Sequence, residues 1–404
     1  MRTTVCHIIT KLELGGAQKT ALFTVAHLDR TRFRPILIAG EPGLLDEQAR
    51  ALEDVEFHQV PCLVRAIRPW KDWQALVALT RLLRKLHPTI VHTHSSKAGI
   101  LGRWAAWLAR VPIISHTVHG YGITPEQPWW LRRLLIGAEW LTGLITDHWV
   151  AVSLADIDSG IRWGLFEGGT VTLIRPGIDI ASYQRPLPPP DRDRQRAEWG
   201  VEPGHLLVGT VSCLKPQKAP HDFVEVAARV CACVPSARFV LVGDGELRPA
   251  VEEHIRSAKL EGRVTIAGWR RDVPALMRAF DVFLLPSHWE GLPQVLLEAR
   301  ASGLPIVATK AGGAAEAIVD GENGWLCEVG DVDGLAARVL EVLMDADQRE
   351  RFRRNAAGIP GEFLNFTALR KREQLYDKLL ERAGRGVQDG THGDQTLGFD
   401  GRAE

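Results

Sequence analysis

The sequence predicts an α/β protein built from two doubly wound parallel-sheet domains. Its 404 residues are too many for one ordinary hydrophobic core. Short apolar runs alternate with helical patterns along the chain, which is the order of elements in parallel sheets covered by helices. The alternation breaks in 175–190, where prolines and a glycine indicate a hinge or linker between two series.

The strands expected in each series are short apolar runs that lead into a turn or a helical pattern. In the first series they are 5–10, 35–40, 89–93, 112–115 and 149–152. In the second they are 206–211, 239–245, 264–268, 282–285 and 305–309. The expected boundaries are 1–180 for the first domain, 181–203 for the linker, 204–365 for the second domain, 366–383 for a final helix that packs back on the first domain, and 384–404 for a disordered tail.

Composition narrows the possible functions. The apolar and charged fractions, 45% and 24%, are typical of a soluble globular protein. The formal net charge is zero, so we expect no general nucleic-acid binder, which needs an excess of Lys and Arg. Six scattered cysteines favour a reducing cytosol, and we expect neither a targeting leader nor a membrane-spanning helix.

The most informative stretch is 286–298, which carries two carboxylates, Glu290 and Glu298. It follows the apolar run 282–285, and Pro293 suits the first turn of a helix. At the carboxyl end of a parallel strand, such a loop offers helix amides to an anion and carboxylates to neighbouring hydroxyls. A phosphate attached to sugars fits that combination. Ordinary capping acids at a helix start are the alternative interpretation.

Two similar domains, a hinge and the Pro-Ser-x-x-Glu-Gly-Leu-Pro loop together resemble the retaining family 4 of the GT-B glycosyltransferases, the glycosyl transferases group 1. The resemblance runs from 14–18 to about Tyr376 and is most specific in 282–316. The segments 91–99 and 116–120 look like those of members that build exopolysaccharides or other lipid-linked glycans.

The resemblance implies a GT-B fold and a metal-independent reaction that retains the configuration of the transferred sugar. The donor is then a nucleotide sugar, with UDP expected, and the acceptor a glycan or a polyprenyl-diphosphate-linked glycan. No cofactor is expected beyond the nucleotide-sugar co-substrate.

The resemblance also assigns the donor-binding residues. In the family, the first Glu of the loop holds sugar hydroxyls and the second holds ribose hydroxyls, which matches Glu290 and Glu298. Gly15 and Gly16 lie at a strand-to-helix turn where backbone amides approach a phosphate closely, although a plain tight turn explains them equally well. The expected donor-binding set is Gly15, Gly16, Lys215, Lys218, Gly268, Trp269, Glu290, Gly291, Leu292 and Glu298.

The chain departs from the family at one donor position. Members usually carry an Arg and, five residues later, a Lys that clamp the diphosphate. Lys218 matches the Lys, but Cys213 stands at the Arg position. The missing fork is worth roughly 1.5–3 kcal/mol per charge-assisted hydrogen bond. Lys215 is a hypothetical substitute, and two solvated lysines are the alternative. Trp269, in turn, either stacks on the base or is a surface residue at a turn.

Four histidines lie close together in the sequence. The resemblance places His119 against the donor sugar, and the expected catalytic residues are His119, Glu290 and Lys218. A metal site is the alternative for the histidines, but the family is metal-independent and no Asp-x-Asp motif accompanies them. The residues expected on the acceptor side are His92, His94, Lys97 and His116.

The helical pattern that begins at Trp129 and Trp130 combines aromatic residues, arginines and leucines. Helices of this composition lie in membrane interfaces, although a core-facing stripe is the commoner reason for such a pattern. We therefore expect a cytoplasmic protein, with a peripheral position at the cytoplasmic membrane face as the alternative.

Two other functions remain open from the sequence. A non-catalytic nucleotide-sugar-binding paralogue is suggested by Cys213. A GT-B epimerase that acts on a UDP-sugar needs no acceptor and produces an isomerised nucleotide sugar.

Overall fold

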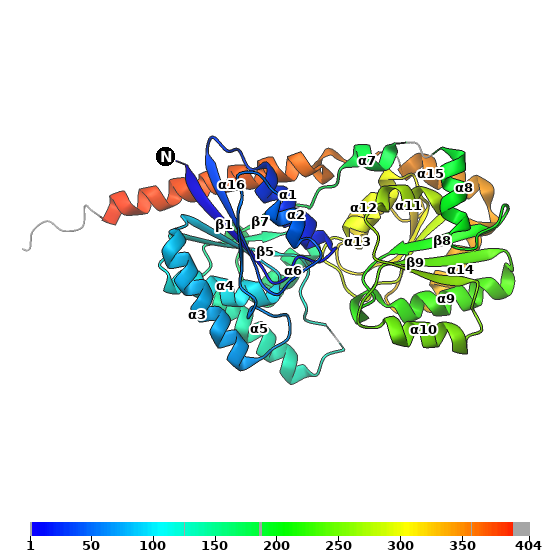
Figure 1. Ribbon diagram of the computed structural model, residues 1–404, viewed down its shortest axis with the longest axis horizontal. Helices are drawn as coiled ribbons and strands as arrows, with labels where there is room; N and C mark the ends of the chain where they lie inside the picture. The colour runs from blue at the N-terminus through cyan, green and yellow to red at the C-terminus, as the bar shows by residue number, and fades with distance from the viewer. Residues whose placement is uncertain (1, 125, 186–187, 357, 391–404) are drawn as a thin grey trace, which may run out of the picture.

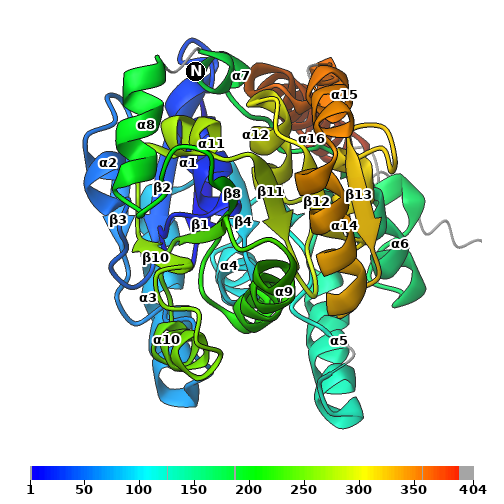
Figure 2. The ribbon, with the colours of Figure 1, turned by 90° about the vertical axis from the view of Figure 1, so that its right-hand side faces the viewer.

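A computed structural model describes residues 2–124, 126–185, 188–356 and 358–390. Two parallel sheets, each covered by helices on both faces, form two domains that face each other (Figures 1 and 2). The first domain holds the blue to teal elements of Figure 1 and the second the green to orange elements.

The first domain is built on a seven-stranded sheet with the order β3-β2-β1-β4-β5-β6-β7. Every neighbouring pair runs parallel, as the alternation of strands and helices predicts. Its strands are β1 Thr3–Ile9, β2 Phe33–Ala39, β3 Glu56–Gln59, β4 Ile90–His94, β5 Ile113–Val118, β6 His148–Ala151 and β7 Val171–Leu173. Its helices are α1 Gly16–His27, α2 Asp46–Arg50, α3 Pro69–Leu86, α4 Ser96–Leu108, α5 Trp129–Gly143 and α6 Leu154–Arg162, and Gly168–Thr170 forms one 3-10 turn.

The second domain is built on a six-stranded parallel sheet with the order β10-β9-β8-β11-β12-β13. Its strands are β8 Leu206–Val211, β9 Ala237–Val242, β10 Val264–Gly268, β11 Val282–Leu285, β12 Ile306–Thr309 and β13 Gly324–Cys327. Its helices are α9 Pro220–Cys233, α10 Arg248–Ser257, α11 Val273–Ala279, α12 Gln294–Ala301, α13 Ala314–Ala317, α14 Val332–Met344 and α15 Ala346–Ala356, with 3-10 turns at Pro216–Lys218 and Gly361–Phe363.

Alternate residues of the central strands face opposite layers, so each sheet has a core on both faces. In the first domain, Val5 and Ile90 pack toward the C-terminal helix, whereas Cys6 and Val91 pack toward α3 and α4. The strands are apolar on both faces for this reason, which explains why the sequence shows continuous apolar runs there.

The short edge strands β3, β7 and β13 are the elements that the sequence pattern does not predict. The linker also contains more structure than expected, because α7 Ile180–Gln184 and α8 Pro189–Ala197 form within it. Part of its proline run, 186–187, lies outside the described residues.

The chain crosses between the domains at two adjacent places. Ile178 and Leu364 form a parallel bridge, and the Ile178 amide donates to the Phe363 carbonyl at 2.9 Å. After the second crossing, α16 Asn365–Gly390 runs back along the first domain (Figure 1). Its Leu369, Leu375 and Leu379 are buried against the first sheet.

The last helix is longer than the sequence pattern predicts. It continues to Gly390, past the boundary expected at 383, and the remainder of the expected tail, 391–404, lies outside the described residues.

Candidate functional site

The strand order of each sheet locates the site. In a doubly wound sheet, ligands bind at the carboxyl ends of the strands where the order reverses. Those points lie between β1 and β4 in the first domain and between β8 and β11 in the second. The loops that follow these four strands line one cleft of about 1060 Å³ between the domains.

Glu290 lies in the loop after β11, with only 6% of its side chain exposed. The ammonium of Lys218, from the loop after β8, contacts Glu290 Oε1 at 2.5 Å. The amide of Gln217 donates to the Trp289 carbonyl at 2.9 Å. The two loops of the second domain are thus tied together, and Glu290 and Lys218 lie side by side.

Glu298 is buried in the second turn of α12, where it faces the first domain. Lys19, from α1, crosses the cleft and places its Nζ 3.0 Å from Glu298 Oε1. Tyr183 lies against the same carboxylate, and burial together with Glu298 raises the pKa of the Tyr183 hydroxyl. A buried carboxylate at the edge of a cleft is suited to accept hydrogen bonds from the hydroxyls of a ligand.

Lys215 also spans the cleft. Its Nζ lies 2.7 Å from Glu13 Oε2 in the loop after β1. Burial raises the pKa of Glu13, but the ion pair with Lys215 outweighs burial and lowers this pKa overall. Cys213 lines the same wall of the cleft, and burial raises the pKa of its thiol, so this position carries no charge. Lys215 and Lys218 are therefore the cations of this loop that face the cleft.

Two loops from different domains touch beside Glu290 because glycines leave room for backbone. A Cβ on Gly120, which has φ +89°, would lie 2.6 Å from the Gly291 nitrogen. That close approach brings His119, which lines the cleft, next to the Glu290 loop. Within the second domain, a Cβ on Gly312, with φ +54°, would lie 1.9 Å from the Glu290 carbonyl oxygen.

The glycine pair at the start of α1 also faces the second domain. Both glycines line the cleft, and a Cβ on Gly16 would lie 2.9 Å from Gln294 Oε1. Gln294 donates to the Thr20 hydroxyl at 2.9 Å. The amides of the first turn of α1 therefore open toward the same cleft as Glu290 and Glu298.

The remaining predicted site residues divide into two groups. Leu292, Gly291, Trp269 and Lys97 line the cleft, and Lys97 is paired with Asp72 at 2.6 Å. Gly268 is not among the lining residues and ends β10 with φ +69°.

The structure corrects the expected position of three histidines. His92, His94 and His116 are buried inside the first domain rather than exposed on the acceptor side of the cleft. The sequence places them at the carboxyl ends of strands, but it does not show that α16 covers the face that holds His92, or that His116 packs on the other face against α4 and Trp149. In residues 2–124, 126–185, 188–356 and 358–390, no group of three or more His, Cys, Asp or Glu is arranged to hold a metal ion.

Several cleft residues escaped the sequence analysis. Lys19, Glu13 and Gln294 each make a contact between the domains. The sequence gives little indication of their role, because each is a common residue type that happens to lie near a motif. Outside the cleft, Arg175 bridges the domains by pairing with Glu316 at 2.5 Å.

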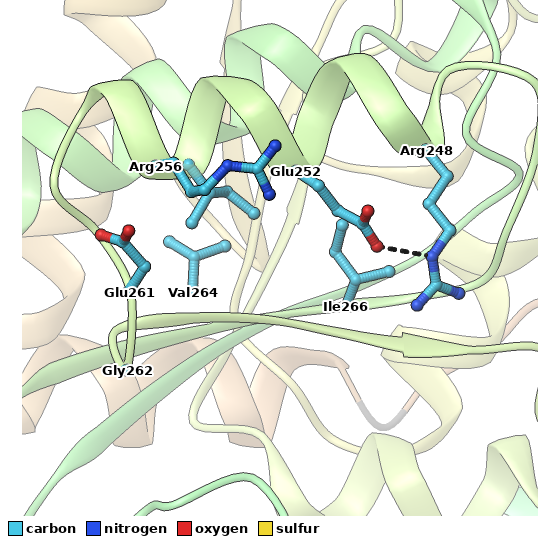
Figure 3. Close-up of a pocket in the computed structure, with 8 residues that line it drawn as sticks. Arg248, Glu252, Arg256, Glu261, Gly262, Val264 and Ile266 are labelled. Atoms are coloured by element: carbon cyan, nitrogen blue, oxygen red, sulfur yellow. Dashed lines mark hydrogen bonds and ion pairs between the residues drawn. The ribbon is translucent and has the colours of Figure 1, made fainter.

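A second hollow lies away from these loops, between α10 and the strand β10 (Figure 3). It measures about 280 Å³, and its Arg248 is paired with Glu252 at 2.8 Å and with Asp244 at 2.7 Å. Its size and its internally paired charges make it a weaker candidate than the interdomain cleft.

Models of two protein families match the chain in succession. Residues 14–182 match the model described as Glycosyltransferase Family 4, and residues 191–358 match that of Glycosyl transferases group 1. Among characterised relatives, the UDP-Gal:alpha-D-GlcNAc-diphosphoundecaprenol alpha-1,3-galactosyltransferase of Escherichia coli is 32% identical over 348 residues, 84% of this chain and 88% of the relative. The capsular polysaccharide biosynthesis glycosyltransferase CapM of Staphylococcus aureus is 22% identical over 81% of this chain and 86% of its own.

Solved structures share the arrangement of both domains. HepE of Anabaena, in complex with UDP-glucose, superposes with a TM-score of 0.79 at 23% identity, over 93% of this chain and all of that one. WaaG, described as a glycosyltransferase involved in lipopolysaccharide biosynthesis, gives 0.75 at 18% identity, over 90% of this chain and 98% of its own.

Proposed function

Given that the chain belongs to glycosyltransferase family 4 and has the GT-B fold, we propose that it transfers a sugar from UDP to a hydroxyl of a lipid-linked glycan with retention of configuration. The observation that carries this proposal is the cleft in which Glu290, Glu298 and Lys218 meet the first turn of α1. The two buried carboxylates can accept hydrogen bonds from sugar and ribose hydroxyls, and the nearby cations and helix amides can bind a diphosphate. Together they match a nucleotide sugar.

Departure of the nucleotide builds negative charge on the diphosphate and positive charge on the anomeric carbon. Lys218, Lys215 and the amides that follow Gly15 are the fixed positive groups on the diphosphate side. Preorganised groups of this kind often supply the largest part of a rate enhancement. Lys218 pairs with Glu290. In the proposed complex the donor offers its hydroxyls to Glu290 and its phosphate to Lys218.

The charges in the cleft favour a same-face substitution over a covalent intermediate. The described residues place four carboxylates on the cleft wall: Glu13, Glu290 and Glu298 are each paired with a lysine, and Asp179 accepts a hydrogen bond from the Ser182 hydroxyl. A nucleophilic carboxylate of the kind that retaining glycosidases use has to be free to attack the anomeric carbon. The proposed step therefore breaks the bond from the anomeric carbon to the diphosphate on the face where the acceptor oxygen bonds, and a donor phosphate oxygen takes the acceptor proton.

The acceptor proposal draws on the outer surface of the first domain as well as on the relatives. The Escherichia coli relative is named for an acceptor on diphosphoundecaprenol, which is a lipid carrier. Helix α4 packs between α3 and α5, and these three helices expose six tryptophans. The set is Trp70, Trp73, Trp107, Trp129, Trp130 and Trp140, defined here as the aromatic face.

The charges around the aromatic face favour an anionic membrane surface. Helices α3, α4 and α5 contain eight Lys or Arg residues and two acids, Asp72 and Glu139. Both acids are neutralised, by Lys97 at 2.6 Å and by Arg103 at 2.6 Å. Exposed tryptophans with unopposed basic residues suit the headgroup region of a bilayer. No helix of the described residues is long and apolar enough to cross one.

A panel of nucleotide sugars tests the proposal. The thermal midpoint of the purified chain is measured with UDP, GDP, ADP and their sugars, and a ligand at a hundred times its Kd adds roughly 2.7 kcal/mol to the free energy of unfolding. We expect stabilisation by UDP and by one UDP-sugar. The stabilising donor is then incubated with a polyprenyl-diphosphate-linked acceptor, and the anomeric configuration of the product is read by NMR.

Four outcomes are distinguishable in that experiment. A lipid-linked product with the donor's anomeric configuration supports the proposal, and an inverted product contradicts retention. An isomerised UDP-sugar formed without acceptor indicates an epimerase. Donor binding without any product indicates a non-catalytic binding protein.

A further inference from the structure

A column of polar side chains runs through the first domain to the cleft. His7 of β1 lies beside His92 of β4 in the sheet register, and His94 follows two residues later on the same face. Tyr376 of α16 covers this face, and all four side chains are buried. The three imidazole rings are stacked, with centroids 4.9–5.2 Å apart. Polar groups this deep in a core need hydrogen-bond partners, and they find them in one another.

Hydrogen bonds connect the column to His119 without a break. Tyr376 Oη lies 3.2 Å from His7 Nε2, and His7 Nδ1 lies 2.9 Å from His94 Nε2. His94 Nδ1 then lies 3.0 Å from His119 Nε2. A side branch starts at the same hydroxyl, because Tyr376 Oη is 2.7 Å from His92 Nδ1. His92 Nε2 is in turn 2.6 Å from the Thr117 hydroxyl.

All the rings of the column are neutral. Burial, followed by the nearby guanidinium of Arg372, lowers the pKa of His7 and of His119 to about 3. The pKa values of His92 and His94 lie well below their usual range for the same first reason, burial. Arg372 is itself only 1% exposed, with its Nη1 bonded to the Thr24 hydroxyl. A buried cation beside the column opposes protonation of any ring.

Because the imidazoles are neutral, the direction of one hydrogen bond in the column determines the direction of the others. Each ring carries one N–H and one lone pair, so fixing one tautomer fixes the next. Tyr376 has a single hydroxyl proton and two histidine neighbours. The shorter contact, to His92, marks the ring that receives this proton, and the longer one marks the ring that donates to the hydroxyl oxygen.

The consequence propagates to the cleft. His7 then donates through Nε2 to Tyr376 and accepts at Nδ1 from His94 Nε2. His94 accepts at Nδ1 from His119 Nε2. The remaining nitrogen of His119, Nδ1, carries a lone pair, and His119 lines the cleft.

We infer that Tyr376, His7 and His94 are positioning residues that fix His119 as the Nε2–H tautomer, so that its Nδ1 accepts a hydrogen bond from a ligand hydroxyl. A lone pair at this point favours a neutral sugar hydroxyl and disfavours a phosphate oxygen, which needs a donor. That this hydroxyl belongs to the donor sugar rests on the proposed function. The tautomer of His119 is inferred from the hydrogen bonds and does not depend on that proposal.

The test reads the tautomer directly. Protein labelled with ¹⁵N-histidine is studied by long-range ¹⁵N–¹H correlation, which separates protonated from unprotonated ring nitrogens, and His119→Gln identifies the His119 signals. We expect His119 in the unmodified protein to show a protonated Nε2 and an unprotonated Nδ1. A protonated Nδ1 or a charged ring would overturn the inference, whether or not any variant folds.

Tyr376→Phe then tests the origin of the preference. It leaves the ring in place and removes the hydroxyl that anchors both branches. We expect the His119 signals to shift toward a mixture of tautomers and kcat to fall about fivefold, for the loss of roughly one hydrogen bond, with the donor KM within twofold. The matched control is Tyr121→Phe, which also removes a buried hydroxyl but one without a hydrogen-bond partner among the described residues. Unchanged His119 signals in Tyr376→Phe would contradict the anchoring role. A correct tautomer in a chain without transferase activity would instead count against the proposed function alone.

Discussion

At the scale of single residues, the cleft is a set of ion pairs that a ligand has to replace. Glu298 is held by Lys19, Glu290 by Lys218, and Glu13 by Lys215. Each carboxylate is thereby neutralised, and for the buried side chains of Glu290 and Glu298 the ion pair lowers the free-energy cost of burial. Opening and ligand binding exchange these partners rather than create new buried charges.

Glu298→Ala is expected to weaken UDP binding more than it lowers turnover. A carboxylate that accepts ribose hydroxyls contributes roughly 1.5–3 kcal/mol per charge-assisted bond, so we expect Kd for UDP to rise about 10-fold or more. Calorimetry with UDP measures this. Glu253→Ala, on the exposed surface of α10, is the control. An unchanged Kd in Glu298→Ala would remove the assigned role.

We expect the two lysines of the β8–α9 loop to bind the donor diphosphate in place of the arginine that family members usually carry. Lys218→Ala and Lys215→Ala should each lower kcat at least tenfold, because each removes a cation that lines the cleft where we propose that the diphosphate binds. Cys213→Ser changes an uncharged position and is the matched control. Single-turnover rates that stay the same in both lysine variants would disprove the phosphate assignment.

The residues of the Glu290 loop could be predicted from the sequence because their types match the chemistry and their order matches a motif. Lys19, Glu13 and Tyr376 could not, because their importance depends on which distant segments the two domains bring together. The buried state of His92 escaped prediction for the same reason, since it depends on a helix almost 300 residues away.

At the scale of elements, α3 and α5 carry aromatic residues where a globular protein usually carries polar ones. Trp70 is 68% exposed and stacks on Trp73, and Trp129 is 70% exposed with Arg133 over its ring. In α5 only Glu139 and Thr142 are buried, so the aromatic pair at its start is not a core-facing stripe. That rejects one of the two interpretations which the sequence left open.

Removing tryptophans from the aromatic face is expected to release the protein from membranes. Replacing Trp70, Trp73, Trp129 and Trp130 with Ser should lower binding to anionic phosphatidylglycerol vesicles more than tenfold in sedimentation, with little change in the free energy of unfolding, since all four are exposed. Met344→Ser with Val329→Ser removes exposed apolar groups from the second domain as the control. Equal binding by both variants would contradict a membrane role for α3 and α5.

The long strands and helices could be predicted because their apolar periodicity is set by burial on two faces. The edge strands β3, β7 and β13 could not, since they have three or four residues each and are partly exposed. Their pairing depends on a neighbour in the sheet rather than on their own sequence.

At the scale of the whole molecule, the buried histidines make stability depend on pH. Their folded pKa values lie below the unfolded value of 6.5, at about 3 for His7 and His119. Well above pH 6.5 neither state binds a proton at these rings, and their contribution to stability is constant. As pH falls from 6.5 toward 3 the unfolded state binds more protons, so stability is lost progressively.

Urea unfolding at pH 7.5 and pH 5.5 checks this expectation. Each such histidine should lower the free energy of unfolding by about 1.4 kcal/mol at the lower pH. His87→Asn, at an exposed left-handed helix end, should leave the difference unchanged. Equal stability at both values would show that the histidine column is protonated or open to water.

The paired sheets and the facing cleft follow from the alternation of elements, and the sequence was sufficient for that architecture. The sequence pattern indicates the position of α16 less clearly than it indicates the two sheets, because a final helix can pack on either domain.

The position of α16 determines how hybrids of this protein have to be joined. The last helix contributes to the core of the first domain although it follows the second in the chain, so the second domain is an insertion between Ile178 and Leu364. A chimaera that keeps the first domain and takes a foreign second domain therefore needs two splice junctions, one beside each of those residues. A single crossover in the linker would pair the native sheet with an alien closing helix, and Tyr376 would be lost.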